Sequence, residues 1–66
     1  MSDDVESFDD CKAIAQTEKA LLVNIPDLGE KWIPQSQIDE DSEVNGKGDE
    51  GTLIVKAWFA KREGWL

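Results

Sequence analysis

The chain has 66 residues, of which 15 are acidic and 7 are basic, so its net charge is −8 at pH 7. A chain of this length forms one domain with a thin core, which disfavours an enzyme with a deep pocket. The negative charge disfavours direct binding to nucleic acid or to an anionic membrane and favours a basic partner. No apolar run approaches the roughly 20 residues that a membrane span requires, so we expect no membrane contact.

Residues 1–10 carry five carboxylates and little apolar material. The acids of this stretch are Asp3, Asp4, Glu6, Asp9 and Asp10. Polar chain ends are generally poorly ordered unless they dock on the rest of the domain. The composition therefore predicts a flexible acidic arm over residues 1–10, unless Val5 and Phe8 dock, and a single folded domain over residues 11–66.

Alternation of apolar and polar residues predicts strands from residue 11 onward. Residues 11–17 ("CKAIAQT") alternate weakly, whereas residues 19–25 ("KALLVNI") alternate strongly. Leu21, Val23 and Ile25 share one face at period two, and the opposite face is also partly apolar. This pattern is typical of a central strand.

A hairpin should follow, because residues 26–29 ("PDLG") combine the proline and glycine that tight turns favour. Residues 30–38 ("EKWIPQSQI") then form the return strand. Pro34 cannot donate a backbone hydrogen bond, so this strand is expected at a sheet edge or bent there. Residues 51–55 ("GTLIV") predict a further strand after a flexible loop.

Near the C-terminus the spacing of apolar residues changes from that of a strand to that of a helix. One helical face is apolar over most of its length, with Val55, Trp58, Phe59 and Arg62 at positions i, i+3, i+4 and i+7. A helix this short is not stable alone, so Trp58 and Phe59 are expected to pack on the sheet. We therefore predict an α+β fold, with a three- or four-stranded antiparallel sheet and one C-terminal helix packed on it.

No set of residues predicts catalysis. The chain lacks histidine and tyrosine, and Cys11 has no neighbouring base other than Lys12. We expect Cys11 to be a small buried residue, and we expect neither an enzyme nor a cofactor. A lone cysteine also excludes an internal disulfide and points to a reducing, cytoplasmic compartment.

The acidic stretch after residue 38 partly fits a calcium-binding loop. Asp39, Asp41, Glu43 and Glu50 would occupy positions one, three, five and twelve. Val44 stands where the loop requires glycine, and no helix precedes the stretch. Calcium binding stays an alternative, and our expectation is that the chain has no metal site.

Clustered acids are the strongest functional signal. Six of them fall within twelve positions: Asp39, Glu40, Asp41, Glu43, Asp49 and Glu50. If this stretch is extended, alternate carboxylates lie about 6.6 Å apart, which resembles the path between successive phosphates of a nucleic acid. We expect these residues to contact a basic partner, and the alternative is an acidic face that only keeps the protein soluble.

Two tryptophans are candidates for an aromatic anchor. Trp65 lies beyond the predicted end of the helix, where it either closes the edge of the core or offers an exposed anchor, and we count it among the partner-binding residues. Trp32 either fills one side of the sheet or docks a partner protein.

Over residues 18–65 the chain resembles small uncharacterised proteins of phages and prophages. The resemblance rests on "WIPQSQI", which follows the hairpin, and on "WFAKREG" in the closing helix. In size and acidity the chain also resembles anti-CRISPR proteins, many of which are small acidic inhibitors of CRISPR effector complexes. This resemblance implies a monomeric inhibitor that acts in the cytoplasm of the host bacterial cell.

These observations predict a binding protein that presents an acidic, nucleic-acid-mimicking surface. Its partner would be a CRISPR effector complex or a similar basic protein that binds DNA or RNA. The alternative is a small β-rich adaptor in phage DNA metabolism, which docks through Trp32, Pro34 or the helix while the acids only solubilise it.

Overall fold

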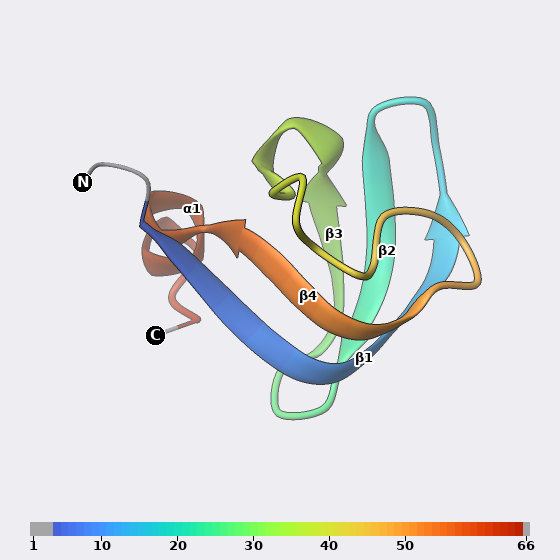
Figure 1. Cartoon of the computed structure of the whole chain (residues 1–66), viewed down its shortest axis with the longest axis horizontal. Helices are drawn as coiled ribbons and strands as arrows, with labels where there is room; N and C mark the ends of the chain where they lie inside the picture. The colour runs from blue at the N-terminus through green and yellow to red at the C-terminus, as the bar shows by residue number, and fades with distance from the viewer. Residues whose placement is uncertain (1–3, 66) are drawn as a thin grey trace.

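The computed structural model describes residues 4–65, which form one antiparallel sheet and one helix (Figure 1). In chain order the elements are β1 (Val5–Gln16), β2 (Ala20–Ile25), β3 (Gly29–Pro34), the 3₁₀ turn η1 (Gln35–Gln37), β4 (Glu50–Lys56) and α1 (Ala57–Arg62). The strand order is β3-β2-β1-β4. The predicted α+β class, antiparallel sheet and C-terminal helix are thus confirmed.

The β2–β3 hairpin follows the sequence pattern closely. Leu21, Val23 and Ile25 are buried, and β2 lies between β3 and β1 as a central strand should. Gly29 begins β3 with φ of 86°, a conformation that glycine adopts without steric cost. Pro34 ends β3, which is an edge strand, as its missing N–H predicts.

β1 is the longest strand and belongs to both halves of the sheet. Its C-terminal half pairs with β2 through residues 12–16. On the other side, β4 pairs with residues 5–8 of the N-terminal half and continues to Cys11 and Lys12. A register shift between Phe8 and Cys11 separates the halves, and Asp10 has φ of 60° there. Such a bulge bends a strand, and β1 and β4 accordingly cross β2 and β3 in Figure 1.

The flexible arm predicted over residues 1–10 is wrong for residues 5–10, which are part of β1. Phe8 is half-buried and packs against the core, and its strand partner is Leu53. The domain boundary at residue 11 therefore falls inside a strand, and residues 1–3 lie outside the described part of the chain.

Residues 38–49 cross the open side of the sheet and cover the outer edge of β4. Ile38 forms an isolated antiparallel bridge with Val55, and the Asp39 N–H donates to the Ile54 carbonyl at 2.8 Å. Val44 is fully buried and extends the core. The acid-rich segment is therefore structural as well as charged, because it pairs an edge that would otherwise be open.

The core between these layers is small and almost wholly aliphatic. Its buried members are Cys11, Ala13, Leu21, Val23, Ile25, Ile33, Val44, Leu53, Val55, Phe59 and Ala60. The burial predicted for Cys11 is confirmed. Within residues 4–65, no helix has the length and apolar composition needed to cross a membrane.

Helix α1 differs from its prediction at one important position. Phe59 and Ala60 are buried, whereas 52% of the Trp58 surface is exposed, so the expectation that both aromatic residues pack on the sheet is wrong for Trp58. The helix has only six residues and buries its Phe59–Ala60 side. Adjacent helical positions point about 100° apart, so Trp58 turns toward solvent when Phe59 turns inward.

Candidate acidic binding surface

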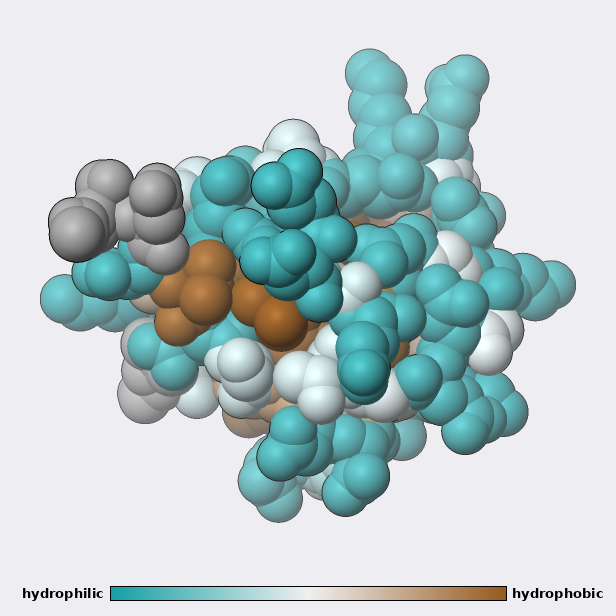
Figure 2. All heavy atoms as spheres, viewed as in Figure 1, coloured by the Kyte–Doolittle hydropathy of each residue, from teal (hydrophilic) through white to brown (hydrophobic). Residues whose placement is uncertain are grey.

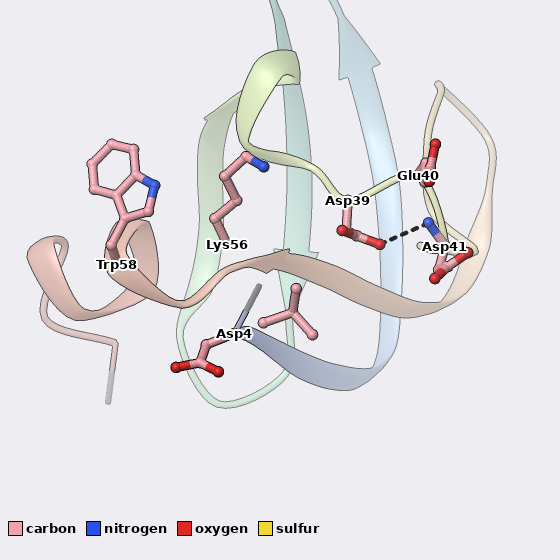
Figure 3. Close-up of a pocket in the computed structure, with 7 residues that line it drawn as sticks. Asp4, Asp39, Glu40, Asp41, Lys56 and Trp58 are labelled. Atoms are coloured by element: carbon pink, nitrogen blue, oxygen red, sulfur yellow. Dashed lines mark hydrogen bonds between the residues drawn. The ribbon is translucent and has the colours of Figure 1, made fainter. Parts of the chain in front are cut away.

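A hollow of about 460 Å³ lies on the outer side of the β1–β4 pair, where α1 begins (Figure 3). We call it the acidic hollow. It is lined by Asp4, Val5, Asp39, Glu40, Asp41, Lys56 and Trp58. These residues come from three separate parts of the chain, which the strand pairing and the 38–43 segment bring together.

The apolar part of the acidic hollow comes from the start of β1 and the start of α1. Val5 is 40% exposed and lies opposite Lys56 in the β1–β4 register. Trp58 stands at one side of the hollow, across from Glu40 and Asp41 (Figure 3). On this face, Figure 2 shows an apolar patch beside the N-terminal end of β1, with hydrophilic residues around it.

The acidic part of the hollow is a turn. The Asp39 carboxylate accepts a hydrogen bond from the Asp41 N–H at 2.9 Å, and the Asp39 carbonyl accepts one from the Ser42 N–H at 3.0 Å. Aspartate favours such turns because its short side chain can bond to the backbone two residues later. The expected extended row with carboxylates about 6.6 Å apart is therefore wrong for residues 39–41.

The other three acids of the predicted set are occupied by structural interactions. Glu43 accepts a hydrogen bond from the Thr52 N–H at 2.9 Å. Asp49 accepts one from the Asn45 N–H and one from the Gly46 N–H, each at 3.0 Å, and so closes its loop. These carboxylates stabilise the backbone of β4 and of the loop before it.

Glu50 forms an ion pair with Lys12 at 3.3 Å. Of the six acids predicted to act together, Asp39, Glu40 and Asp41 line the acidic hollow, and the other three do not. Asp4 joins the group from the N-terminal stretch.

The electrostatics of the hollow favour a cation. Four carboxylates and one ammonium group, that of Lys56, line the hollow. Among residues 4–65 the one ion pair joins Lys12 to Glu50, so no described carboxylate lies within ion-pair distance of Lys56. A hollow with an exposed indole at one side and carboxylates at the other suits the long aliphatic stem and the charged head of a lysine or arginine side chain. The arrangement can therefore hold a basic side chain of a partner.

Trp65 takes the first of its two predicted roles. Its ring contacts Phe8 at a centroid distance of 5.8 Å and Phe59 at 5.3 Å, both edge to face. It is partly buried and closes the edge of the core, so it is not an exposed anchor. The aromatic residue that the sequence reasoning missed is Trp58, and the two adjacent aromatic residues in a short helix were the available signal.

The structure also places Cys11 and the residues of the calcium-loop alternative. Cys11 is 1% exposed, and burial, together with the nearby Asp9 and Asp10, raises the pKa of its thiol. Its Sγ donates to the Phe8 carbonyl at 3.3 Å. Over the described residues, no group of three or more acidic, histidine or cysteine side chains is placed to hold a metal ion, and Glu43 and Glu50 of the calcium alternative are engaged elsewhere.

Fold and surface together define a small α+β protein with an acidic, tryptophan-sided hollow on one face of its sheet. Comparison of the chain with protein families, curated proteins and solved structures gave no match.

Proposed function

We propose that this protein is a monomeric binding protein whose acidic hollow engages a lysine- or arginine-rich, nucleic-acid-binding surface of a partner. The observation that carries the proposal is that Asp4, Asp39, Glu40 and Asp41 line one hollow, with the half-exposed Trp58 at its side. Binding of this kind would exclude DNA or RNA from the partner, so the protein acts as an inhibitor.

Charge and an aromatic contact have different parts in this interaction. The overall charge of −8 accelerates the encounter with a basic surface and makes it sensitive to salt. Charge alone gives modest affinity, whereas a buried aromatic anchor commonly dominates an interface. Trp58, half exposed at the side of the hollow, is suited to that part.

The CRISPR effector complexes of the bacterial cytoplasm are the partner class that we propose to test first, because their guide and target strands occupy positively charged channels. The assay mixes the protein with a panel of purified effector complexes, each loaded with guide RNA, and measures binding of labelled target DNA. We expect at least one complex to lose DNA binding in proportion to the added protein. If no complex loses DNA binding at a large excess of protein, this assignment is wrong.

A matched pair of charge reversals tests the site. Glu40 and Asp41 are exposed, and no hydrogen bond of their carboxylates is found within residues 4–65, so Glu40→Lys with Asp41→Lys should fold normally. The control is Glu18→Lys with Glu30→Lys, which changes the net charge equally at exposed positions away from the hollow. We expect the first variant to weaken partner binding by about tenfold or more and the control to change it less than about threefold.

The adaptor alternative keeps one specific observation in its favour. Trp32 is 52% exposed and lies opposite the partly buried Leu22 on the outer side of the β2–β3 pair. Under this second candidate, partner binding is insensitive to salt, is lost in Trp32→Ala and is unaffected in Trp58→Ala. Under the acidic-hollow proposal, partner binding is lost in Trp58→Ala, is unaffected in Trp32→Ala and weakens steeply as the salt concentration rises.

A further inference from the structure

The N-terminal half of β1 has a strand on one edge only. Pairing with β2 begins at Lys12, so over residues 5–9 the edge that faces away from β4 has no strand partner within the described chain. The free edge extends about 16 Å at a rise of about 3.3 Å per residue.

The hydrogen bonds of β4 identify the backbone groups that this edge presents. Thr52 and Ile54 direct their carbonyl oxygens away from β1, to Glu43 and Asp39. Successive residues of a strand point their backbone N–H and C=O groups to opposite edges. The backbone groups of Leu53 and Val55 therefore point toward β1, where these residues pair with Phe8 and Glu6.

It follows that Val5 and Ser7, and Asp9 at the start of the bulge, direct their backbone groups outward, to the free edge. The Asp4 carbonyl fits this alternation, because it accepts a hydrogen bond from the Ala57 N–H on the β4 side. Ser7 and Asp9 are both exposed. The edge therefore offers the alternating donors and acceptors that an added strand requires.

A surface hollow of about 380 Å³ lies along this edge. One of its walls is β1 itself, and the other is the end of β2 with the turn that follows it. It is lined by Ser7, Phe8, Asp9, Asp10, Ile25, Pro26 and Asp27. An extended segment laid on the edge would place every second side chain against Phe8, Ile25 and Pro26, and the intervening side chains outward.

The charge around the edge selects the occupant. Asp9, Asp10 and Asp27 are exposed, and the nearby Lys12 is engaged by Glu50. A second copy of this chain would bring the same carboxylates against themselves, so pairing of two copies along this edge is unfavourable. A basic segment would instead neutralise them.

The opposite sheet edge is less suited to strand addition. β3 ends in Pro34, which has no N–H to donate and is a usual protection of an edge strand. Residues 5–9 carry no such proline.

We propose that residues 5–9 of β1 bind an extended peptide segment of a partner protein as an added strand, and that this segment alternates lysine or arginine with small apolar residues. This site shares only Val5 with the acidic hollow, among the residues that the structure describes: the Val5 side chain lines that hollow, which lies on the outer face of the β1–β4 pair and not at the free edge.

A synthetic peptide of alternating lysine and valine, with blocked ends, is the probe. Its binding is measured by calorimetry and by the protection of backbone amides from hydrogen exchange. We expect the peptide to bind and to protect the Ser7 and Asp9 amides. A control peptide with the same side chains and an N-methyl group on every residue keeps the charge but has no backbone N–H to donate to the edge, and we expect it to bind at least about tenfold more weakly.

Ser7→Pro removes the outward N–H without touching the β4 ladder, and Ser7→Ala is its matched control. We expect only Ser7→Pro to weaken peptide binding, by about tenfold. Equal binding of the two peptides, protection of Glu30 and Trp32 amides instead, or no binding of either peptide would each overturn the proposal. The peptide comparison uses the unaltered protein, so it decides the question even if Ser7→Pro does not fold.

Discussion

The Ser42 hydroxyl accepts a hydrogen bond from the Ile54 N–H at 3.0 Å, and this bond anchors the acid-rich segment on the outer edge of β4. The same oxygen accepts from the Val44 N–H at 3.2 Å and donates to the Val44 carbonyl at 3.0 Å. Ser42 is 4% exposed, so one buried hydroxyl satisfies backbone groups of Val44 in its own segment and of Ile54, which lies 12 residues after Ser42. The position of Asp39, Glu40 and Asp41 at the hollow depends on this attachment.

Ser42→Ala should lower the free energy of unfolding by about 2 kcal/mol, because it leaves buried backbone groups of Ile54 and Val44 without a partner. Ser36→Ala is the control, since Ser36 is exposed and, among residues 4–65, its hydroxyl accepts a hydrogen bond only from the Gln37 side chain, at 3.2 Å. Urea unfolding followed by tryptophan fluorescence measures both variants. Equal stability of the two would show that Ser42 does not hold the segment.

Gly51→Ala should also destabilise the fold, by about 2–3 kcal/mol. Gly51 has φ of +136°, and an added Cβ would lie 2.5 Å from the Glu43 carboxylate oxygen that accepts from Thr52. At Gly48, with φ of +93°, an added Cβ meets nothing within 4 Å, so Gly48→Ala should cost only about 1 kcal/mol of backbone strain.

A double-mutant cycle with Glu43→Ala separates the two causes for Gly51. If the clash with the Glu43 carboxylate matters, Gly51→Ala costs less in the Glu43→Ala background than in the unaltered protein, although the Cβ of residue 43 stays 3.3 Å from the added Cβ. An unchanged cost in that background would assign the whole effect to backbone conformation.

Trp65→Ala and Trp58→Ala should differ sharply in stability. Trp65 packs edge to face on both Phe8 and Phe59, so its removal should cost about 3 kcal/mol. Trp58 contacts Phe59 at a centroid distance of 6.2 Å and is half exposed, so its removal should cost less than about 1 kcal/mol. Thermal unfolding measures both, and a large loss in Trp58→Ala would contradict its assignment as a free anchor.

Cys11 should make the fold less stable at alkaline pH. Burial, with a further contribution from Asp9 and Asp10, raises the pKa of its thiol above that in the unfolded chain. The thiol of the folded protein therefore keeps its proton to higher pH than the thiol of the unfolded chain. The stability that the protonated thiol contributes is complete below the unfolded-state pKa and is lost as pH rises through the folded-state pKa.

We expect the free energy of unfolding to fall from about pH 8.5 upward, and to fall less steeply in Cys11→Ala. The chain has no tyrosine, which leaves lysine as the other side chain that titrates in this range. Comparing the slopes of the two proteins cancels the lysine contribution. Parallel slopes would show that the thiol pKa is not raised by folding.

Local sequence patterns were sufficient to predict the β2–β3 hairpin, because the residues that determine it are close together in the chain. Period-two burial of Leu21, Val23 and Ile25, the turn at residues 26–29 and the edge position of Pro34 each follow from residues that are neighbours in the chain. The burial of Cys11 followed in the same way from its size and apolar character.

Long-range contacts decided the remainder. Residues 5–10 form a strand because β4, more than 40 residues later, supplies the partner edge, and no local pattern in an acidic stretch reports this. Asp39 and Asp41 lie in a turn because Ser42 and the backbone of Ile54 hold the segment there.

By itself the sequence determined the α+β class, the hairpin and the excess of negative charge, since these depend on composition and on spacing along the chain. Only the tertiary structure decided which carboxylates share a surface and which tryptophan stands beside them. The physical reason is that a small sheet is closed by contacts between distant segments, and the energy of those contacts outweighs the weak local preferences of acidic loops and of a six-residue helix.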